Sequence, residues 1–389
     1  MFVPDVAVIG PVMDDPRSWI DRAADPDRWW EVVHSDTAIG VQLDDGAIDL
    51  GVQTGADPCA VATSSTSAPH LVAAMLDLLE AGPGNRVLEV GTGTGWTAAL
   101  LARRAGAASV VSVEVDAAVA EQAAANLRSA GIGVRVITAD GTRGWPAAAP
   151  YDRVHVTVGA ADIPYAWVEQ TRPGGVIVLP WMPGWRSGHL VKLTVADDGT
   201  ATGPIGEPCG FMLLRDQRRP PGPVEGDKRR SRAVVTPREV AEAGEGFEIA
   251  MAGFMPGVEG GGFDNDDGSY RLTARSGDSR ALVVHRPGEA AAQVEQIGPR
   301  DLWDEIVASY RRWTTWGRPG SERFGLSVTH DGTQLWLDRP NSRVQAPVMG
   351  KHGKGEDCSM CNGSGKQTYN VDNKTETRNC PGCRGSGKV

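Results

Sequence analysis

The sequence predicts an α/β fold with a mostly parallel sheet, followed by an α+β C-terminal domain and a small cysteine-rich tail. Three observations support this prediction. Between residues 82 and 180, short apolar runs alternate with helical patterns, which is typical of right-handed β-α-β units. A cluster of glycines separates the first apolar run from its helix. Four of the six cysteines fall within the last 32 residues, apart from both domains.

The first of these elements is the stretch 86–101, RVLEVGTGTGWTAALL. Residues 87–90 predict a strand buried on both faces, and an Ala/Leu-rich helix follows from Trp96. Gly91, Gly93 and Gly95 lie between them, where glycine permits a sharp turn and lets a ligand approach the main chain. The helix N-terminus would point toward that ligand. A glycine turn that binds no ligand is the alternative.

The next two predicted strands, 109–115 and 134–138, are each associated with an acidic residue. Glu114 lies nineteen residues after Gly95, about where a carboxylate can accept both ribose hydroxyls of an adenosine ligand. The glycine spacing is G-x-G-x-G rather than the dinucleotide fingerprint, but NAD and S-adenosylmethionine (SAM) both remain open here. After the third strand, Asp140 can accept from an adenine amino group, and Gly141 lets the base lie close.

The order of the later elements favours SAM. Predicted strands at 154–158 and 176–180 complete an order that resembles the class I SAM-dependent methyltransferases. More closely, the stretches STSAPH at 65–70, DGTRGWP and APYDRVHVT resemble the protein-L-isoaspartate O-methyltransferase family. The resemblance runs from about Thr63 to Arg215. It implies a Rossmann-like fold, SAM as cofactor, and methyl transfer to a side-chain or isoaspartyl carboxylate.

The resemblance also assigns roles to individual residues. Glu89 and the glycine turn would hold the methionine part of SAM, Glu114 the ribose, and Asp140 with Gly141 the adenine. Ser67 would lie beside the methyl-accepting carboxylate and is the predicted catalytic residue, the alternative being a helix N-cap. The predicted cofactor-binding residues are Glu89, Gly91, Thr92, Gly93, Gly95, Glu114, Asp140 and Gly141.

Residues 1–62 are interpreted as a cover segment with two short helices within 18–33. The chain departs from the family here. DRWWEVVHSDTAIGVQLDDG stands where family members usually carry a Pro-Arg-Glu-x-Phe-Val-Pro stretch. That region helps frame the substrate cleft in the family, so the replacement puts the usual substrate in question.

The methyltransferase domain is predicted at 63–216, completed by a strand pair within 189–216. A linker follows at 217–232, whose basic run predicts either a solvated connector or a contact for an acidic peptide. Residues 233–345 predict a second domain with an amphipathic helix at 301–313, a hairpin at 324–338 and a mobile acidic loop at 260–268. We interpret it as a peptide-substrate domain, a passive stabilising domain being the alternative. The combination is similar to actinobacterial relatives associated with ribosomally made, modified peptides.

The tail at 346–389 carries two C-x-x-C pairs separated by eighteen residues. This spacing predicts a structural zinc site with four thiolate ligands. Each pair extends to C-x-x-C-x-G-x-G, which resembles the cysteine-rich repeats of DnaJ-type chaperones. Peptide capture, a nucleic-acid zinc ribbon and structural stapling all remain open as roles. The predicted ligands are Cys358, Cys361, Cys380 and Cys383.

Composition limits the remaining function classes. With a net charge of −10, the whole chain is not an obvious nucleic-acid binder. The sequence has no run of 18 apolar residues that would predict a membrane span, and no secretory signal is recognised. We therefore expect a cytoplasmic enzyme. The favoured function is esterification of an aspartyl carboxylate in a ribosomally made, modified precursor peptide, leading to aspartimide or isoaspartate. Isoaspartate repair of proteins is the alternative, and a peptide-binding adaptor with an inactive core is a third hypothesis.

Overall fold

The computed structural model describes residues 2–9, 18–51, 60–218, 222, 224–345, 366–371 and 374–379. The chain divides into two compact units, 1–345 and 346–389. The second unit contains an antiparallel pair, β19 (Lys366–Val371) and β20 (Lys374–Asn379). The four tail cysteines lie outside the described residues, so the zinc site stays a prediction. In the part of the chain that is described, no helix is long and apolar enough to cross a membrane.

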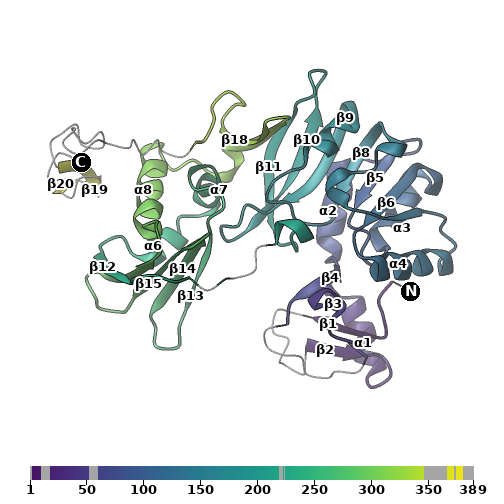
Figure 1. Ribbon diagram of the computed structural model, residues 1–389, viewed down its shortest axis with the longest axis horizontal. Coiled ribbons are helices and arrows are strands. Elements are labelled where there is room, and N and C mark those ends of the chain that lie inside the picture. Colours follow the sequence, from purple (N-terminus) through teal and green to yellow (C-terminus); the bar gives the residue numbers. More distant parts are fainter. Residues whose placement is uncertain are drawn as a thin grey trace. The chain divides into compact units, whose positions relative to one another are not determined.

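The centre of the first unit is a nine-stranded sheet (Figure 1). Its parallel strands follow the order β7-β6-β5-β8-β9, and β10, β11, β17 and β18 continue it in antiparallel pairs. This confirms the Rossmann-like fold of the class I methyltransferases. The bounds are β5 (Val87–Val90), β6 (Val110–Glu114), β7 (Arg135–Thr138), β8 (Tyr151–Val156), β9 (Thr171–Trp181), β10 (Gly188–Val195), β11 (Ala201–Cys209), β17 (Phe324–Thr329) and β18 (Gly332–Leu337).

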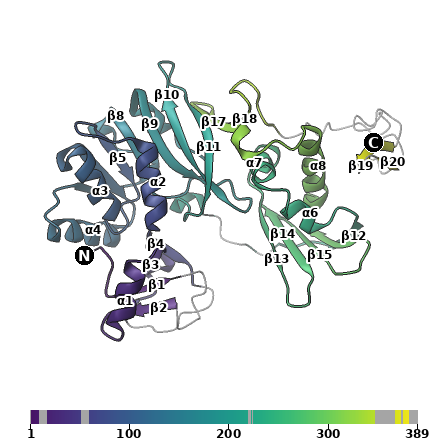
Figure 2. The same cartoon turned by 180° about the vertical axis from the view of Figure 1, so that it is seen from behind.

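Helices pack against this sheet, and Figure 2 shows α2, α3 and α4 beside its parallel strands. α2 (Pro69–Leu79) packs on β8, β9 and β10, while α3 (Trp96–Ala105) packs on β5 and β6. α4 (Ala117–Ser129) lies against β6 and β7, and the short α5 (Tyr165–Glu169) contacts β9 and β17. Because helices cover the parallel strands, all four residues of β5 are buried, as their apolar pattern predicts.

The N-terminal segment forms a small sheet rather than only helices. Its order is β2 (Trp19–Asp21), β1 (Val6–Ile9), β3 (Ile39–Leu43) and β4 (Ala62–Thr66), with α1 (Pro26–Val33) packed on β2. Of the two helices expected within 18–33, the second is present and the first is wrong. Trp19 and Ile20 are buried in strand pairing with β1. Two adjacent apolar residues cannot distinguish a helix from a strand, because neither period is sampled.

The predicted hairpin at 324–338 is confirmed as β17 and β18, but it extends the nine-stranded sheet by pairing with β11. The physical reason is that β11 would otherwise present a row of unpaired backbone groups at the sheet edge. The sheet of the predicted methyltransferase domain, 63–216, thus includes two strands from the range 233–345 that was assigned to the second domain. The five domain ranges stay predictions.

A five-stranded antiparallel sheet follows the order β12-β16-β15-β14-β13. The basic run expected in a linker forms most of the edge strand β12, and the predicted mobile acidic loop largely forms β13. The polar residues of β12 and β13 give no strand pattern in the sequence, because these edge strands are held mainly by backbone pairing with their neighbours. The bounds are β12 (Arg229–Ala233), β13 (Glu259–Asp264), β14 (Tyr270–Ser276), β15 (Ser279–His285), β16 (Ala292–Ile297), α6 (Pro237–Ala241), α7 (Glu245–Phe254) and α8 (Leu302–Thr315).

Candidate active site

A cavity of about 620 Å³ lies where β5 and β6 end, within the size range of small-molecule sites. One wall is the stretch 62–68, which includes β4. The glycine turn 91–94 and the end of β6 at 113–115 make another part of the wall. Residues 210–215 and Arg218 line the remaining side. The position agrees with the general rule that ligands of open α/β sheets bind beyond the carboxyl ends of the strands.

The glycine turn adopts a backbone that glycine favours. Gly91, Gly93 and Gly95 have φ values of 92°, 54° and 84°. A Cβ atom on Gly91 would lie 2.8 Å from the Oγ1 atom of Thr157, so the position has no room for a side chain. Gly91 and Gly93 line the cavity, whereas Gly95 begins α3 and does not. The turn therefore presents main chain directly to the cavity.

Glu114 lies on the cavity wall at the end of β6. Its Oε2 atom accepts a hydrogen bond from the backbone N–H of Gly93 at 3.0 Å, and Oε1 accepts from the backbone N–H of Asp116 at 3.1 Å. A carboxylate can accept about four hydrogen bonds, so it retains capacity for ribose hydroxyls. The two backbone bonds hold this carboxylate beside the turn.

Glu89 lies beneath the turn and is fully buried. The Ser112 hydroxyl donates to Oε2 of Glu89 at 2.5 Å, and the Oγ1 atom of Thr92 lies 2.6 Å from the same hydroxyl. Burial raises the pKa of Glu89 to about 8, with a smaller contribution from the charge of Glu114. Its Oε1 atom has no hydrogen-bond partner among the described residues. Glu89 reaches the cavity wall only through Ser112 and Thr92.

Asp140 and Gly141 follow β7 and differ in their exposure to the cavity. Gly141 lines it, and a Cβ atom there would lie 2.6 Å from Cγ1 of Val90. The Oδ1 atom of Asp140 accepts from the backbone N–H and the hydroxyl of Thr142, at 3.0 and 2.7 Å. Asp140 itself is not on the cavity wall, so its adenine contact stays a prediction.

Ser67 lines the cavity between β4 and α2. The alternative that it caps α2 is wrong, because the N-cap residue is Ala68 and the backbone N–H of His70 donates instead to Oδ1 of Asp36 at 2.9 Å. A row of hydroxyl side chains, 64–67, continues along the same wall. The Thr66 hydroxyl donates to Oγ1 of Thr94 at 3.2 Å, which ties this wall to the glycine turn.

Two arginines on the cavity wall were missed by sequence reasoning. Arg215 lies 3.0 Å from both Asp45 and Asp116, and Arg218 lies 2.9 Å from Asp45. Burial alone would raise the pKa of Asp116. Hydrogen bonds from Val119 and from the Arg215 guanidinium outweigh burial and lower that pKa. No local signal in the sequence marks these pairs, because their members are far apart along the chain.

The structure thus brings most of the predicted residues to one cavity. Its lining includes Ser67, Gly91, Thr92, Gly93, Glu114 and Gly141, while Glu89, Gly95 and Asp140 lie behind or beside that lining. The glycine cradle and the carboxylate of Glu114, which line the cavity, suit a ligand that carries hydroxyl groups. The role of each residue remains a prediction.

Comparisons with known proteins agree with the resemblance. Residues 45–219 match the model of the protein-L-isoaspartate(D-aspartate) O-methyltransferase family. The protein-L-isoaspartate O-methyltransferase of Pyrococcus horikoshii is 45% identical over 140 residues, 36% of this chain and 63% of that protein. The protein of the same name from Methanoculleus marisnigri is 43% identical over 149 residues, 38% of this chain and 66% of that protein. This chain therefore spans less than two thirds of each of these relatives.

A solved structure of a protein-L-isoaspartate O-methyltransferase aligns over 80% of this chain and 89% of its own, at 21% identity and a TM-score of 0.45. The segment that matches the family model, 45–219, begins upstream of the predicted start near Thr63 and ends four residues after the predicted end at Arg215. It includes every residue of the predicted cofactor-binding set and Ser67.

Proposed function

We propose that the protein is a SAM-dependent carboxyl O-methyltransferase that acts on isoaspartyl residues of polypeptides. The observation that carries the proposal is the family match over 45–219, because that segment supplies almost all of the cavity wall. Both curated relatives named above are called protein-L-isoaspartate O-methyltransferases. The proposal transfers this activity to the present chain.

SAM is the cofactor that the cavity residues fit. Glu114 would hold the ribose hydroxyls, the main chain of Gly91 and Gly93 would face the methionine part, and Gly141 would face the adenine. When bound, SAM supplies an activated methyl group on its sulfonium. The glycine turn would leave no side chain between the main chain and the cofactor.

The chain's own contribution to the reaction is positioning. A carboxylate acceptor is already ionised near neutral pH, with a reference pKa of about 4, so it needs no general base. Ser67, which lines the cavity, would orient that carboxylate by donating a hydrogen bond. Holding nucleophile and electrophile in line, with water excluded, is then the main source of rate acceleration. The resulting ester is attacked by a neighbouring backbone nitrogen, which releases methanol and forms a succinimide.

A second candidate function is maturation of a ribosomally made precursor peptide through an ordinary aspartate. The observation that favours it is the five-stranded sheet with α6, α7 and α8, which lies wholly outside the matched segment. A repair enzyme that accepts many short sequences has little use for such an addition. The repair activity is nevertheless better supported by the relatives, and we place it first.

Mass spectrometry after incubation with SAM tests the proposal. One reaction contains a short isoaspartyl peptide, and a second contains the same peptide with ordinary aspartate. Esterification of the isoaspartyl peptide alone supports the proposed function, and Ser67→Ala should slow it. Esterification or loss of water only with ordinary aspartate would instead support precursor maturation. Failure to bind SAM in calorimetry would reject both and leave an inactive adaptor.

We also propose that the tail binds one structural zinc ion through its four cysteines. Support comes from the C-x-x-C spacing alone, which suits tetrahedral thiolate coordination. A location in the cytoplasm is part of the same proposal, because reduced thiolates are available there for metal binding.

A further inference from the structure

α6 and α8 contact the five-stranded sheet, and the face that carries its exposed and half-buried residues is called the open face. The linker touches one end of this face, where Arg280 donates to the carbonyl of Gly222 at 2.6 Å and Gly226 lies beside Ile297. Side chains alternate across it, as in β14, where Leu272 is buried while Arg271 and Thr273 are exposed. The pairing registers align the open-face residues in three rows. The rows are Phe263–Arg271–Val284–Gln293–Arg232, Gly261–Thr273–Leu282–Glu295–Arg230, and Glu259–Arg275–Arg280–Ile297.

The open face carries five arginines and two glutamates, all on neighbouring strands. The glutamates are already paired: Glu295 lies 3.2 Å from Arg230 and 2.8 Å from Lys228, and Glu259 bonds Arg275 at 2.7 Å. The other three arginines, 232, 271 and 280, are exposed and pair with no carboxylate among the described residues. The face therefore has a surplus of positive charge on a chain whose net charge is −10.

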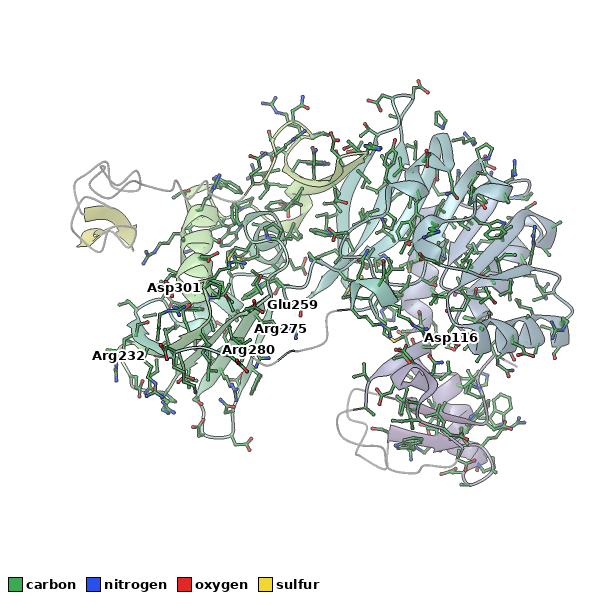
Figure 3. The ribbon with its side chains drawn as sticks, viewed as in Figure 1. Asp116, Arg232, Glu259, Arg275, Arg280 and Asp301 are labelled. Atoms are coloured by element: carbon green, nitrogen blue, oxygen red, sulfur yellow. The ribbon has the colours of Figure 1, made fainter. Side chains whose placement is uncertain are left out.

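Arg275 and Arg280 are direct cross-strand neighbours, and Figure 3 shows both on this sheet together with Arg232 and Glu259. Like charges directly opposite each other destabilise a sheet, and here Glu259 compensates Arg275 but no carboxylate among the described residues compensates Arg280. Between the arginines lie the half-buried apolar side chains of Leu282, Val284 and Ile297. The surface is thus cationic with an apolar centre.

We propose that this open face docks an acidic segment of a polypeptide, adjoining the residue that is methylated in the active site. The link between docking and methylation rests on the proposed function, whereas the docking itself does not. Arginine forks match carboxylates in a bidentate geometry, and the apolar strip suits the side chains that alternate with them. A strand-like acidic segment can satisfy both features at once.

Other occupants fit less well. The tail 346–389 contains seven Lys and Arg residues against four Asp and Glu residues, so it has the same sign of charge as the face. A nucleic acid offers phosphates to the arginines but no apolar side chains to cover Leu282, Val284 and Ile297, which an alternating acidic and apolar peptide does. Charge complementarity therefore favours an acidic polypeptide.

Fluorescence anisotropy with the full chain tests this assignment. The probe is a labelled peptide of alternating Asp and Leu, and an oligo(dT) strand of equal charge is the comparison. R232E/R271E should weaken peptide binding on the order of tenfold or more, because two charge-assisted contacts are lost. R103E/R128E changes the net charge equally at exposed helical positions away from the sheet, and should keep the affinity within about twofold.

Equal weakening by both double variants, tighter binding of the oligonucleotide, or no peptide binding to the wild type would each overturn the proposal. Photo-crosslinking of the peptide to the wild type is a second measurement that needs no variant. Crosslinks should fall on β12 to β16, and crosslinks elsewhere would contradict the assignment. Methylation of a neutral isoaspartyl peptide is measured in parallel. Its absence in the wild type would reject the proposed function but leave the binding result valid.

Discussion

At the scale of single residues, the nine-stranded sheet contains two fully buried ionisable side chains, Glu89 and His155, whose protonation affects stability. They are neighbours across β5 and β8. Burial raises the pKa of Glu89 to about 8 and lowers that of His155 to about 3, so both are neutral in the folded protein near pH 7. A neutral Glu89 can still polarise Thr92 through Ser112. Acid therefore destabilises the folded protein through His155, and base destabilises it through Glu89.

Glu89→Gln should flatten the pH dependence of stability above pH 5. In the native state Glu89 keeps its proton until the pH approaches 8, whereas in the unfolded chain it loses the proton near 4.5. Its contribution is complete below 4.5 and is lost as the pH rises toward 8, by about 3 kcal/mol at pH 7. Urea unfolding at pH 5 and pH 7 measures this, with exposed Glu121→Gln as the control. Equal pH slopes for the two variants would contradict the burial argument.

His155→Leu should remove a loss of stability in acid. Neither ring nitrogen has a hydrogen-bond partner among the described residues, and burial, with Arg104, lowers the histidine's pKa. The unfolded chain takes up a proton below about pH 6.5 while the folded chain does not. The stability contributed by His155 should therefore fall by about 2 to 3 kcal/mol between pH 7.5 and 4.5, while that of Glu89 rises over the same range. The expected signal is therefore the change with pH in the stability difference between wild type and His155→Leu. Thermal melts across this range test the expectation. His34, which is exposed, gives the control His34→Gln, and a stability difference between wild type and His155→Leu that stays constant with pH would refute the expectation.

At the scale of elements, the active site depends on the turn between β5 and α3 and on β4. The turn supplies main chain to the cavity, and β4 supplies hydroxyl groups from a different sheet. The Thr66–Thr94 hydrogen bond and the ion pairs of Arg215 with Asp45 and Asp116 connect these two parts. Polar contacts therefore join the parts of the chain that line the cavity.

Gly91→Ala should abolish SAM binding, while Gly84→Ala should preserve it. Both glycines have positive φ, of 92° and 84°, so both variants incur the left-handed penalty of roughly 1–2 kcal/mol. Only the Cβ atom at 91 would also clash, since Thr157 lies 2.8 Å away and nothing lies within 4 Å at 84. Calorimetric titration with SAM and urea unfolding separate the two effects. Equal affinity in both variants would show that the turn backbone does not contact the cofactor.

At the scale of the whole molecule, what could be predicted is what the chain encodes locally. The strand–turn–helix at 87–105 and the position of Glu114 follow from contiguous residues, and the structure contains them. The pairing of β17 with β11 joins residues more than a hundred positions apart, and Arg215 meets Asp45 and Asp116 only in the folded chain. The hydrophobic periodicity of the sequence contains no information about such distant partners. The same holds for β12, whose polar sequence becomes a strand only because β16 pairs with it.

The tail offers a prediction that is independent of the methyltransferase core. Because 346–389 forms a unit of its own, metal binding there should leave SAM binding unchanged. Elemental analysis of the purified full chain should find one zinc ion per chain. Cys361→Ser should lose most of it, because removing one thiolate leaves an incomplete tetrahedral site, while Cys59→Ser retains it. A chelator should remove the metal from wild type and release thiolates that react with a colorimetric thiol reagent. Full zinc content in Cys361→Ser would contradict the four-cysteine site, and a loss of SAM affinity on chelation would show that the two units are coupled.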